Sequence, residues 1–477
     1  MLNYALRRYL VLGTLPLLAL AVANAGLGMM LADARTKGVA LAVLPVALVA
    51  IGSLIASNRA ILVFGALAIG LFKPLPLSGP LPLHTGFTLY TSDVLVLLAV
   101  ASWVAAWLVN REEVRPSSLQ TRLLGWPLLL FGIMLFAGIV RGHERYGEKL
   151  VGVPLRFLLY AGIAAALTDL TPRDAYKRLV VLFYAGTVWQ AGVAVYRDAT
   201  GTSAAALSGT LSTGGERVLG GSVAMFMAGA LLLAFLNLDR DRRARMTALH
   251  LLMAALAIFA LVSTFQRTTF ALVSVLVPLS LLAFRRIGLR MAAFLPLFAP
   301  FLVLLLLVIP KANPSLFPTL ADRITASPST DATANWRLIA YAAVWSQVRE
   351  SPVTGVGFGR PVSFVSKGVQ YNVEQDPHNQ FLFLWAGGGS LLVGSFILLL
   401  AVYLLEVWRR LRSATKEERR LIFFAVSLWF VFVVNSLTGI ILTVPNLLLS
   451  FWILMVLPMV VRPRDLLDVT ASSHSRV

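Results

Sequence analysis

The sequence contains no cysteine and few charged residues. The lack of cysteine excludes disulfide bonds, thiolate metal ligands and a cysteine nucleophile. Asp, Glu, Lys and Arg make up only 13% of the 477 residues, whereas 58% are hydrophobic. Many apolar runs are long enough to cross a bilayer of roughly 30 Å. We therefore predict an all-α polytopic membrane protein that forms a single integral membrane domain over residues 1–477.

The apolar runs predict 12 to 14 transmembrane helices, with about one helix per run. The third run is weak because Pro74, Pro76, Pro80 and Pro82 interrupt it and the residues that follow. The predicted spans cover residues 9–31, 38–56, 60–77, 92–109, 123–140, 150–167, 179–196, 219–236, 247–263, 268–284, 291–309, 380–405, 420–439 and 443–461.

Acidic side chains are scarce inside these spans. All 22 Asp and Glu residues can be placed in loops or at span ends, and among the basic residues only Arg156 lies clearly within an apolar run. Proton-coupled transporters commonly carry intramembrane carboxylates and are often built from two repeated halves. Neither feature is visible here. The pattern favours chemistry at one face of the membrane over transport through it.

Basic residues outnumber acidic ones and give a formal net charge of +19. No Lys- or Arg-rich arm with interleaved aromatic residues is present, so we expect no nucleic-acid partner. In a membrane protein, excess Lys and Arg mark the cytoplasmic loops. An inside N-terminus puts most of them on the cytoplasmic side, including segments 240–245 and 409–420. Both termini are then cytoplasmic, and the loop 310–379 faces the exterior or periplasm.

The loop 310–379 contains a predicted helix. Residues 335–350 include neither Gly nor Pro and carry the amphipathic aromatic residues Trp336, Tyr341 and Trp345. This composition predicts a helix that lies along the membrane surface.

A Gly-rich segment follows that helix, with Gly355, Gly357 and Gly359 after Pro352. A nucleotide-binding loop needs a preceding strand and an immediately following helix, and the sequence predicts neither. We expect these glycines to permit tight turns that bring the backbone close to a substrate.

The loop ends in Asp376, Pro377, His378 and Asn379, directly before the span that starts near residue 380. His378 is one of five histidines, and it lies at a predicted boundary between water and lipid. A neutral imidazole there could serve as a base toward a lipid-borne substrate. In the alternative interpretation, His378 belongs to a polar interface and Asp376 caps the helix. We interpret the other histidines as structural or incidental: His84, His143, His250 and His474.

Three arginines recur at the outer ends of predicted spans: Arg156, Arg217 and Arg267. Arg267 lies in a turn of only a few residues, which would hold it in place. Such arginines can simply extend toward lipid phosphates. Alternatively, they converge on a diphosphate, which a planar guanidinium binds through two parallel hydrogen bonds. A cationic cluster of this kind can replace a metal ion, so we expect neither a metal nor a cofactor.

A resemblance to a known family rests on residues 335–392. The order Arg337, Trp345, Pro352, the glycines at 355–359, His378-Asn379, Leu382 and Gly389 resembles the signature of the O-antigen ligase and polymerase superfamily of bacterial membrane glycosyltransferases. The chain departs from the pattern at Gly387, where members often have glutamate.

The resemblance implies a mainly helical, GT-C-like membrane fold in the bacterial inner membrane. The donor would be a glycan on undecaprenyl diphosphate, transferred to an acceptor hydroxyl at the periplasmic face among membrane lipids. By similarity, His378 matches the family's essential histidine, and Arg217 and Arg267 match its outer-face arginines. An O-antigen ligase, with lipid A-core as acceptor, is favoured slightly. The alternatives are an O-antigen or exopolysaccharide polymerase, whose acceptor is a second lipid-linked glycan, and a transporter of lipid-linked glycan.

We hypothesise an inverting, metal-independent transfer. A sugar hydroxyl attacks the anomeric carbon, His378 accepts or steers its proton, and Arg217 and Arg267 stabilise the departing diphosphate. Asn379 is expected to orient the imidazole or a sugar hydroxyl. The substrate-binding candidates are Arg156, Asn379, Arg337, Trp345 and Arg360.

Overall fold

The computed structural model describes residues 59–72, 90–109, 118–147, 152–162, 167, 170–200, 219–240, 244–264, 266–283, 332–366, 369–373, 378–439 and 442–461. The predicted spans 9–31, 38–56 and 291–309 lie outside the described residues.

Each of the other predicted spans coincides with a helix. Six helices are long and apolar enough to cross a membrane. They are α6 (Ser118–Tyr146), α9 (Pro172–Thr200), α11 (Gly221–Arg240), α12 (Ala244–Val262), α17 (Gln380–Ser413) and α18 (Lys416–Asn435). Five further apolar helices are shorter within the described residues, namely α4 (Arg59–Leu71), α5 (Thr91–Val109), α7 (Gly152–Ala161), α13 (Arg267–Ala283) and α19 (Pro445–Val456) with the 3₁₀ turn Leu457–Val460. The prediction of an all-α polytopic membrane protein is confirmed, and the total number of spans stays a prediction.

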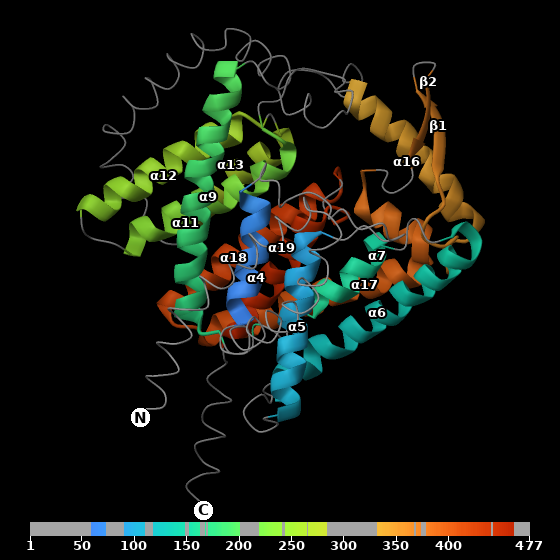
Figure 1. Ribbon diagram of the computed structural model, residues 1–477, viewed down its shortest axis with the longest axis horizontal. Coiled ribbons are helices and arrows are strands. Elements are labelled where there is room, and N and C mark those ends of the chain that lie inside the picture. The colour runs from blue at the N-terminus through green and yellow to red at the C-terminus, as the bar shows by residue number, and fades with distance from the viewer. Residues whose placement is uncertain are drawn as a thin grey trace, which may run out of the picture.

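α11 is the most buried of the six long apolar helices, whereas α6 lies at the periphery of the bundle (Figure 1). The apolar part of α11 is 89% buried, because α9, α12, α13 and α18 pack around it. A helix that is apolar on all sides requires such surroundings. The corresponding part of α6 is only 33% buried, and Trp126, Ile133 and Phe136 are exposed on it. Exposed apolar side chains of this kind are suited to contact lipid.

Asn379 starts α17. Its side-chain oxygen accepts hydrogen bonds from the backbone N–H groups of Phe381 and Leu382, each at 3.1 Å, which is the geometry of a helix N-cap. Asp376, which the alternative interpretation of the motif made the cap, lies outside the described residues. The cap of this helix is therefore Asn379.

The predicted helix 335–350 is present as α16 (Ala332–Glu350). A two-stranded antiparallel hairpin follows, formed by β1 (Val362–Ser366) and β2 (Val369–Val373), with Phe364 opposite Tyr371. The predictions above do not include this hairpin. Its sequence nevertheless carries part of the signal, since apolar and polar residues alternate over 369–373 and over 362–364, and Gly368 lies between the two segments.

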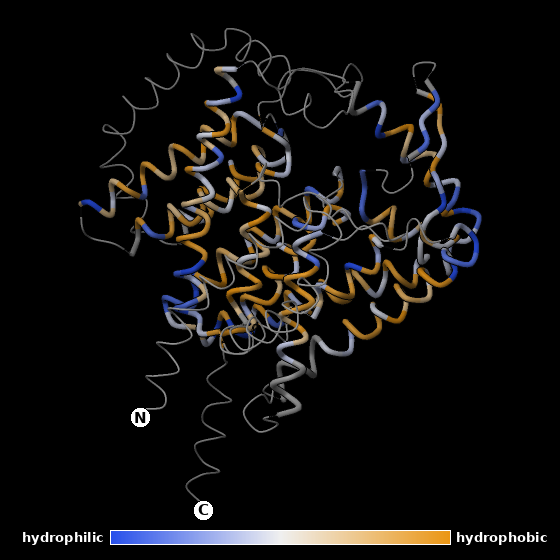
Figure 2. The backbone as a smooth tube through the Cα atoms, in the orientation of Figure 1, coloured by the Kyte–Doolittle hydropathy of each residue, from blue (hydrophilic) through white to orange (hydrophobic). Residues whose placement is uncertain are grey.

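α16 and the hairpin pack on each other and on α17. Val362 and Phe364 form a small apolar cluster with Ala340, Val344, Val348 and Ala386. Ala340, Val344 and Val348 are spaced by four residues and so share one face of α16. Figure 1 shows α16 and the hairpin together at one edge of the molecule, and Figure 2 shows hydrophilic residues gathered there. The buried face of α16 therefore contacts protein; its predicted position along the membrane surface stays a prediction.

The Gly-rich segment replaces two hydrogen bonds inside α17. At Gly389 the helix is kinked, with φ 73° and ψ −172°. In a regular helix the Ser390 N–H would bind the Ala386 carbonyl; here Ser390 N donates to Pro352 O at 2.8 Å, and Ala386 O accepts from Val356 N at 2.8 Å. One residue further, the carbonyl of Gly387 accepts from Gly357 N at 3.2 Å. The kink thus costs no backbone hydrogen bonds at these positions, because the loop supplies the partners.

The glycines allow this close docking. Gly355 and Gly357 have φ 71° and 99°, in the region that favours glycine. A Cβ on Gly355 would lie 2.6 Å from the backbone nitrogens of Gly388 and Gly389, and a Cβ on Gly387 would overlap the ring of Phe358. The glycines therefore permit the tight turns expected from the sequence and bring the loop backbone against α6 and α17; the expected approach of this backbone to a substrate stays a prediction. The overlap at Gly387 also explains why no glutamate fits there in this chain.

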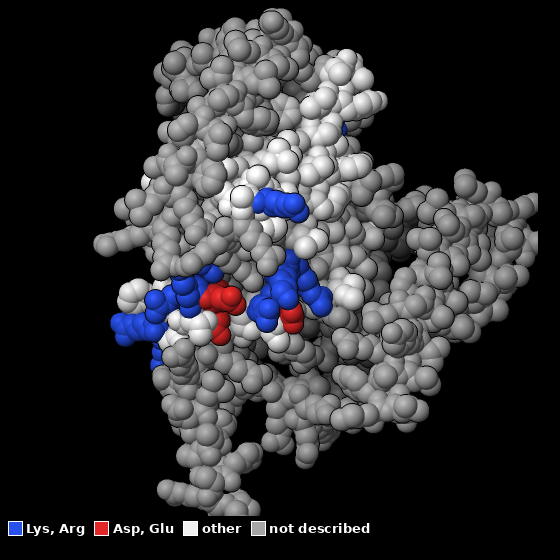
Figure 3. Space-filling model, turned by 90° about the vertical axis from the view of Figure 1, so that its left-hand side faces the viewer, with Lys and Arg blue, Asp and Glu red and all other residues white. Residues whose placement is uncertain are grey.

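Helix ends that the predicted topology puts on the same side contact one another. At the predicted outer ends, Gln380 N donates to Ser436 O at 2.8 Å and Leu219 N donates to Ser263 O at 3.1 Å. At the predicted inner ends, Arg410 of α17 donates to Met459 O at 2.8 Å. Figure 3 shows charged residues gathered in a band on the face that it draws. These contacts support the alternation of the helices, while the assignment of the cytoplasmic side stays a prediction.

Candidate functional site

His378 lies just before the cap of α17, where α16 and the end of α18 meet it. Its ring packs edge-to-face on Trp336 of α16, with the ring centroids 5.1 Å apart. The hydroxyl of Tyr341 lies 3.0 Å from the carbonyl oxygen of His378 and 3.2 Å from that of Leu437, so it donates to this pair of acceptors. We call this junction the His378 corner.

The backbone of His378 is in the left-handed region, with φ 61°, and no other non-glycine residue that the structure describes has a positive φ. This conformation costs an L-residue roughly 1–2 kcal/mol, although histidine adopts it more often than most residues. The hydrogen bond from Tyr341 to the His378 carbonyl and the Asn379 cap that follows hold the conformation. Residues kept in such regions cluster at active sites, where they fix the direction of a side chain.

Aromatic side chains form a wall beside the imidazole. Trp336 contacts Phe364 and Tyr371 of the hairpin edge-on, at centroid distances of 5.4 and 6.1 Å. Phe364 and Tyr371 stack on each other at 5.5 Å. The hairpin therefore supports Trp336 from behind and limits how far the His378 ring can move.

The turn between α12 and α13 is tied to the same corner. Gln266 Nε2 donates to Asn435 Oδ1 at 2.9 Å, and Thr269 Oγ1 lies 3.4 Å from the same oxygen. Asn435 ends α18 and precedes Ser436, the residue whose carbonyl binds the Gln380 N–H. The backbone of Arg267, the first residue of α13, is thus brought to the end of the bundle that holds His378.

Arg217 lies outside the described residues. Leu219, two residues later in the chain, donates its N–H to the carbonyl of Ser263, next to the α12–α13 turn. The predicted roles of Arg217 and Arg267 on a diphosphate stay predictions.

Arg156 is paired with a carboxylate inside the protein. Its Nε lies 3.2 and 3.1 Å from the two carboxylate oxygens of Asp93, and both side chains are at most 5% exposed. Asp93 also accepts hydrogen bonds from the Tyr160 hydroxyl and from Tyr90 N. Two buried opposite charges with further hydrogen bonds form a stable pair. The pair joins α7 to α5, so the geometry gives no support to the predicted role of Arg156 in substrate binding.

Of the remaining candidates, Asn379 and Trp345 have structural contacts. The oxygen of Asn379 is engaged by the backbone of α17, so this side chain positions the helix that follows His378. Trp345 packs edge-on against Trp385 at 5.3 Å, and Trp385 Nε1 donates to Pro352 O at 3.0 Å. Arg337 follows Trp336 in α16 and is half-buried. Their roles on a substrate stay predictions.

Arg360 is held at the far end of α16 from His378. It forms a two-pronged ion pair with Glu350, in which Nη2 lies 3.1 Å from Oε1. Glu350 follows Trp336 by fourteen residues, which is about 21 Å along a helix. The structure therefore does not bring Arg360 together with His378.

The Glu350–Arg360 pair predicts a small effect of pH on stability. The hydrogen bond and charge of Arg360 lower the pKa of Glu350 below its ordinary value. A lowered carboxylate pKa stabilises the fold above the unfolded-state value, near pH 4.3, and this contribution is lost as the pH falls through the folded-state pKa. We expect Glu350→Gln to melt slightly below the wild type at pH 7 and level with it at pH 3. Thermal unfolding in detergent at both pH values checks this; an equal difference at both would contradict it.

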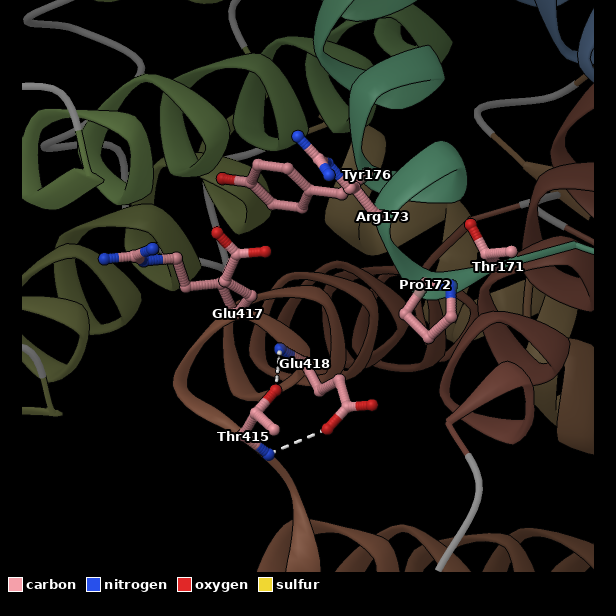
Figure 4. Close-up of a pocket in the computed structure, with 8 residues that line it drawn as sticks. Thr171, Pro172, Arg173, Tyr176, Thr415, Glu417 and Glu418 are labelled. Atoms are coloured by element: carbon pink, nitrogen blue, oxygen red, sulfur yellow. Dashed lines mark hydrogen bonds between the residues drawn. The ribbon is translucent and has the colours of Figure 1, made fainter.

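A separate cavity of about 190 Å³ lies at the opposite end of the bundle, between the starts of α9 and α18. Figure 4 shows Arg173 and Tyr176 of α9 facing Glu417, while Thr415 and Glu418 bond to each other's backbone as a capping box. Thr415 and Glu418 thereby cap the first turn of α18. None of the catalytic or substrate-binding residues predicted from the sequence lines this cavity.

His250 is part of a buried polar chain that begins at this cavity. Tyr176 donates to Asn237 at 3.0 Å, Asn237 bonds to Tyr184, and the Tyr184 hydroxyl lies 2.8 Å from His250 Nδ1. The chain ties α9, α11 and α12 together, which agrees with the structural role expected for His250. Among the described residues, no group of three His, Asp or Glu side chains is arranged to hold a metal ion.

Comparison with known protein families finds a match that covers the part of the His378 corner contributed by α16 and the start of α17. Residues 252–397 match the family model described as O-antigen ligase. This part of the chain is therefore similar to the O-antigen ligase superfamily. The O-antigen ligase domain supports a ligase- or polymerase-type activity in general. The comparison with curated proteins finds no match.

The O-antigen ligase domain contains most of the predicted site residues. It runs from α12 through α13, α16, the hairpin and the first half of α17. The predicted residues inside it are Arg267, Arg337, Trp345, Arg360, His378 and Asn379, and those outside it are Arg156 and Arg217.

Sequence reasoning missed Gln266, Gln380 and Asn435 at this corner. Gln266 precedes Arg267 directly, Gln380 follows His378 by two residues, and Asn435 lies within a predicted span. Polar side chains at or inside the ends of apolar runs are rare and often functional, so their positions carried a usable signal.

Proposed function

We propose that the protein is an O-antigen ligase-type glycosyltransferase of the bacterial inner membrane. It transfers a glycan from undecaprenyl diphosphate to a sugar hydroxyl of lipid A-core at the periplasmic face. One observation carries the proposal: His378 is held in a left-handed backbone conformation against Trp336 within the O-antigen ligase domain. The start of α13, with Arg267, reaches the same end of the bundle and supports it further.

In the proposed reaction the acceptor oxygen attacks the anomeric carbon on the face opposite the diphosphate, so the configuration inverts. The bond from that carbon to the diphosphate oxygen breaks, and its electron pair stays on the diphosphate. His378 takes or steers the hydroxyl proton as a neutral imidazole. Arg267 and Arg217 stabilise the negative charge that grows on the leaving diphosphate.

The fixed surroundings of His378 are the means by which the fold would assist this step. Proton transfer needs the base within hydrogen-bond reach of the attacking hydroxyl. Trp336 packs against the ring, while Tyr341 holds the carbonyl of His378 and the Asn379 cap fixes the backbone that follows. A base positioned in advance avoids part of the entropic cost of orienting the reactants.

Replacing Arg267 by alanine is expected to lower the transfer rate roughly 10²-fold, because one charged donor to the leaving group is lost. Arg267→Lys keeps the charge without the planar fork and should recover part of the rate. Steady-state transfer by purified protein checks both, and Arg349→Ala, an exposed arginine on α16, is the control that keeps full activity. Equal rates for wild type and Arg267→Ala would contradict this role.

Reconstitution into liposomes with a defined lipid-linked donor separates the candidate functions. A ligase forms a new glycosidic product only when lipid A-core is added. A polymerase makes longer chains from the donor alone, and a transporter moves the donor across the bilayer without forming a new bond. We expect product only with the added acceptor; longer chains from the donor alone would replace the proposal by the polymerase alternative.

A further inference from the structure

Three side-chain amide atoms at the His378 corner are buried without a hydrogen-bond partner among the described residues. Gln380 is fully buried, and both its Oε1 and its Nε2 lack a partner, as does Oε1 of Gln266. Leaving a buried donor or acceptor unsatisfied costs about 1–3 kcal/mol, and buried polar groups are nearly always bonded. We call these three atoms open, meaning that they have no hydrogen-bond partner among the described residues. Because they belong to two glutamines of one corner, they indicate a place where a ligand or water forms the missing hydrogen bonds.

Both glutamines are anchored to the same turn of the chain. Gln380 donates its backbone N–H to Ser436 O at 2.8 Å, and Gln266 Nε2 donates to Asn435 Oδ1 at 2.9 Å. Asn435 itself is engaged on both sides, since its Oδ1 also accepts from Thr269 and its Nδ2 donates to Val431 O at 2.8 Å. Asn435 thus acts as a fixed support, and the open atoms belong to the two glutamines.

The open atoms select the chemistry of the ligand. They comprise two carbonyl oxygens, which need donors, and one amide nitrogen, which needs an acceptor. A diphosphate only accepts at its ionised oxygens and would leave the oxygens of Gln266 and Gln380 unmatched, while a cation would leave the nitrogen unmatched. A hydroxyl both donates and accepts, and a sugar ring presents several in a row.

We propose that Gln266 and Gln380 bind the hydroxyl groups of the first sugar of the donor, the one attached to the diphosphate. This inference rests on the proposed function. Gln266 directly precedes Arg267, the residue assigned to the diphosphate, and Gln380 follows His378, the residue assigned to the attacking hydroxyl. The first sugar lies between these two reacting groups in the donor, so its hydroxyls are the ones within reach of both glutamines.

Gln380→Met tests the subsite, since methionine keeps the length of the side chain and removes the amide. The probes are undecaprenyl diphosphate and the same lipid carrying one N-acetylglucosamine or one galactose, titrated against the purified full chain. In the wild type a sugar-bearing lipid should bind more tightly than the bare lipid. In Gln380→Met that preference should fall roughly 10-fold for the loss of two hydrogen bonds, while binding of the bare lipid is unchanged.

Thermal stability distinguishes this role from a purely structural one. Removing an amide that has no partner among the described residues should leave the melting temperature of Gln380→Met equal to or above that of the wild type. Gln190→Met is the matched control: Gln190 is buried in α9 and its Nε2 donates to Leu71 O at 2.7 Å. The control should melt at a lower temperature and keep the wild-type preference for the sugar.

Two outcomes overturn the inference. If the wild type binds bare and sugar-bearing lipids equally, or if Gln380→Met keeps the preference, the open amides hold water. The subsite is tested by binding of the lipid and the proposed function by transfer of the glycan. Because binding does not require transfer, either proposal can fail without the other. A protein that binds the sugar but never transfers it would contradict the proposed function alone, and one that transfers it while Gln380→Met keeps the preference would contradict the subsite alone.

Discussion

Replacing His378 by alanine is expected to lower the rate of glycan transfer roughly 10³-fold, while the protein still folds and inserts. A positioned base contributes typically 10²–10⁴-fold to such a step. The imidazole is half-buried and packs edge-on against Trp336 outside the main apolar core, so its removal takes away little of that core. Transfer by purified, reconstituted protein measures the rate, and size-exclusion profiles together with melting temperatures measure the fold.

A second variant separates the imidazole from the backbone that carries it. Alanine is disfavoured at φ 61°, whereas asparagine tolerates the left-handed region and can still form hydrogen bonds. His378→Asn should therefore match the wild type in stability and remain as inactive as His378→Ala. Wild-type transfer by either variant would remove His378 from the mechanism. Partial rescue of His378→Ala by added imidazole would assign proton transfer, rather than positioning, to the ring.

Replacing Gly389 by alanine is expected to destabilise the protein by about 2–5 kcal/mol. Its φ of 73° costs a residue with a Cβ roughly 1–2 kcal/mol. The added Cβ would in addition overlap the carbonyl oxygen of Val353, and overpacking of this kind costs about 1–3 kcal/mol. The backbone oxygen cannot move away without breaking the exchange of hydrogen bonds between the loop and α17.

The effect should reach the candidate site, because that exchange fixes the loop between α16 and α17. Gly389→Ala is expected to melt several degrees below the wild type and to lose transfer activity along with stability. Gly394→Ala is the matched control, five residues later in the same helix with open space around its Cβ position. It should be neutral or slightly stabilising, as alanine is in a helix interior. Equal melting temperatures for the two variants would show that α17 tolerates a regular helix at the kink.

The transmembrane helices followed from the sequence alone wherever the structure describes them. Each apolar run is long enough to require a helix, because lipid offers no partner for backbone N–H and C=O groups. The helix at 335–350 could also be predicted from its composition, because the segment contains neither Gly nor Pro. The hairpin was not predicted, because each strand has only five residues and the period-2 alternation is complete in the second strand alone.

The candidate site was predictable only in part. His378 stood out because a histidine at the start of an apolar helix has few structural reasons to be there. Arg156 and Arg360 looked equally open in the sequence, yet one pairs with Asp93, 63 residues away, and the other with Glu350. The sequence shows where a charged residue stands, but the residue with which it pairs is seen only in the folded structure, where segments distant in the chain come into contact.

The sequence by itself determined that this protein is a helical membrane protein with an O-antigen ligase domain, because hydrophobic length and motif order are properties of neighbouring residues. Only the tertiary structure decided that Asn379 caps α17, that the Gly-rich loop takes over hydrogen bonds of the kinked helix, and that amide atoms of Gln266 and Gln380 are buried without a partner among the described residues. Those features depend on backbone angles and on contacts between segments far apart in the chain. Such contacts form only when the whole bundle packs.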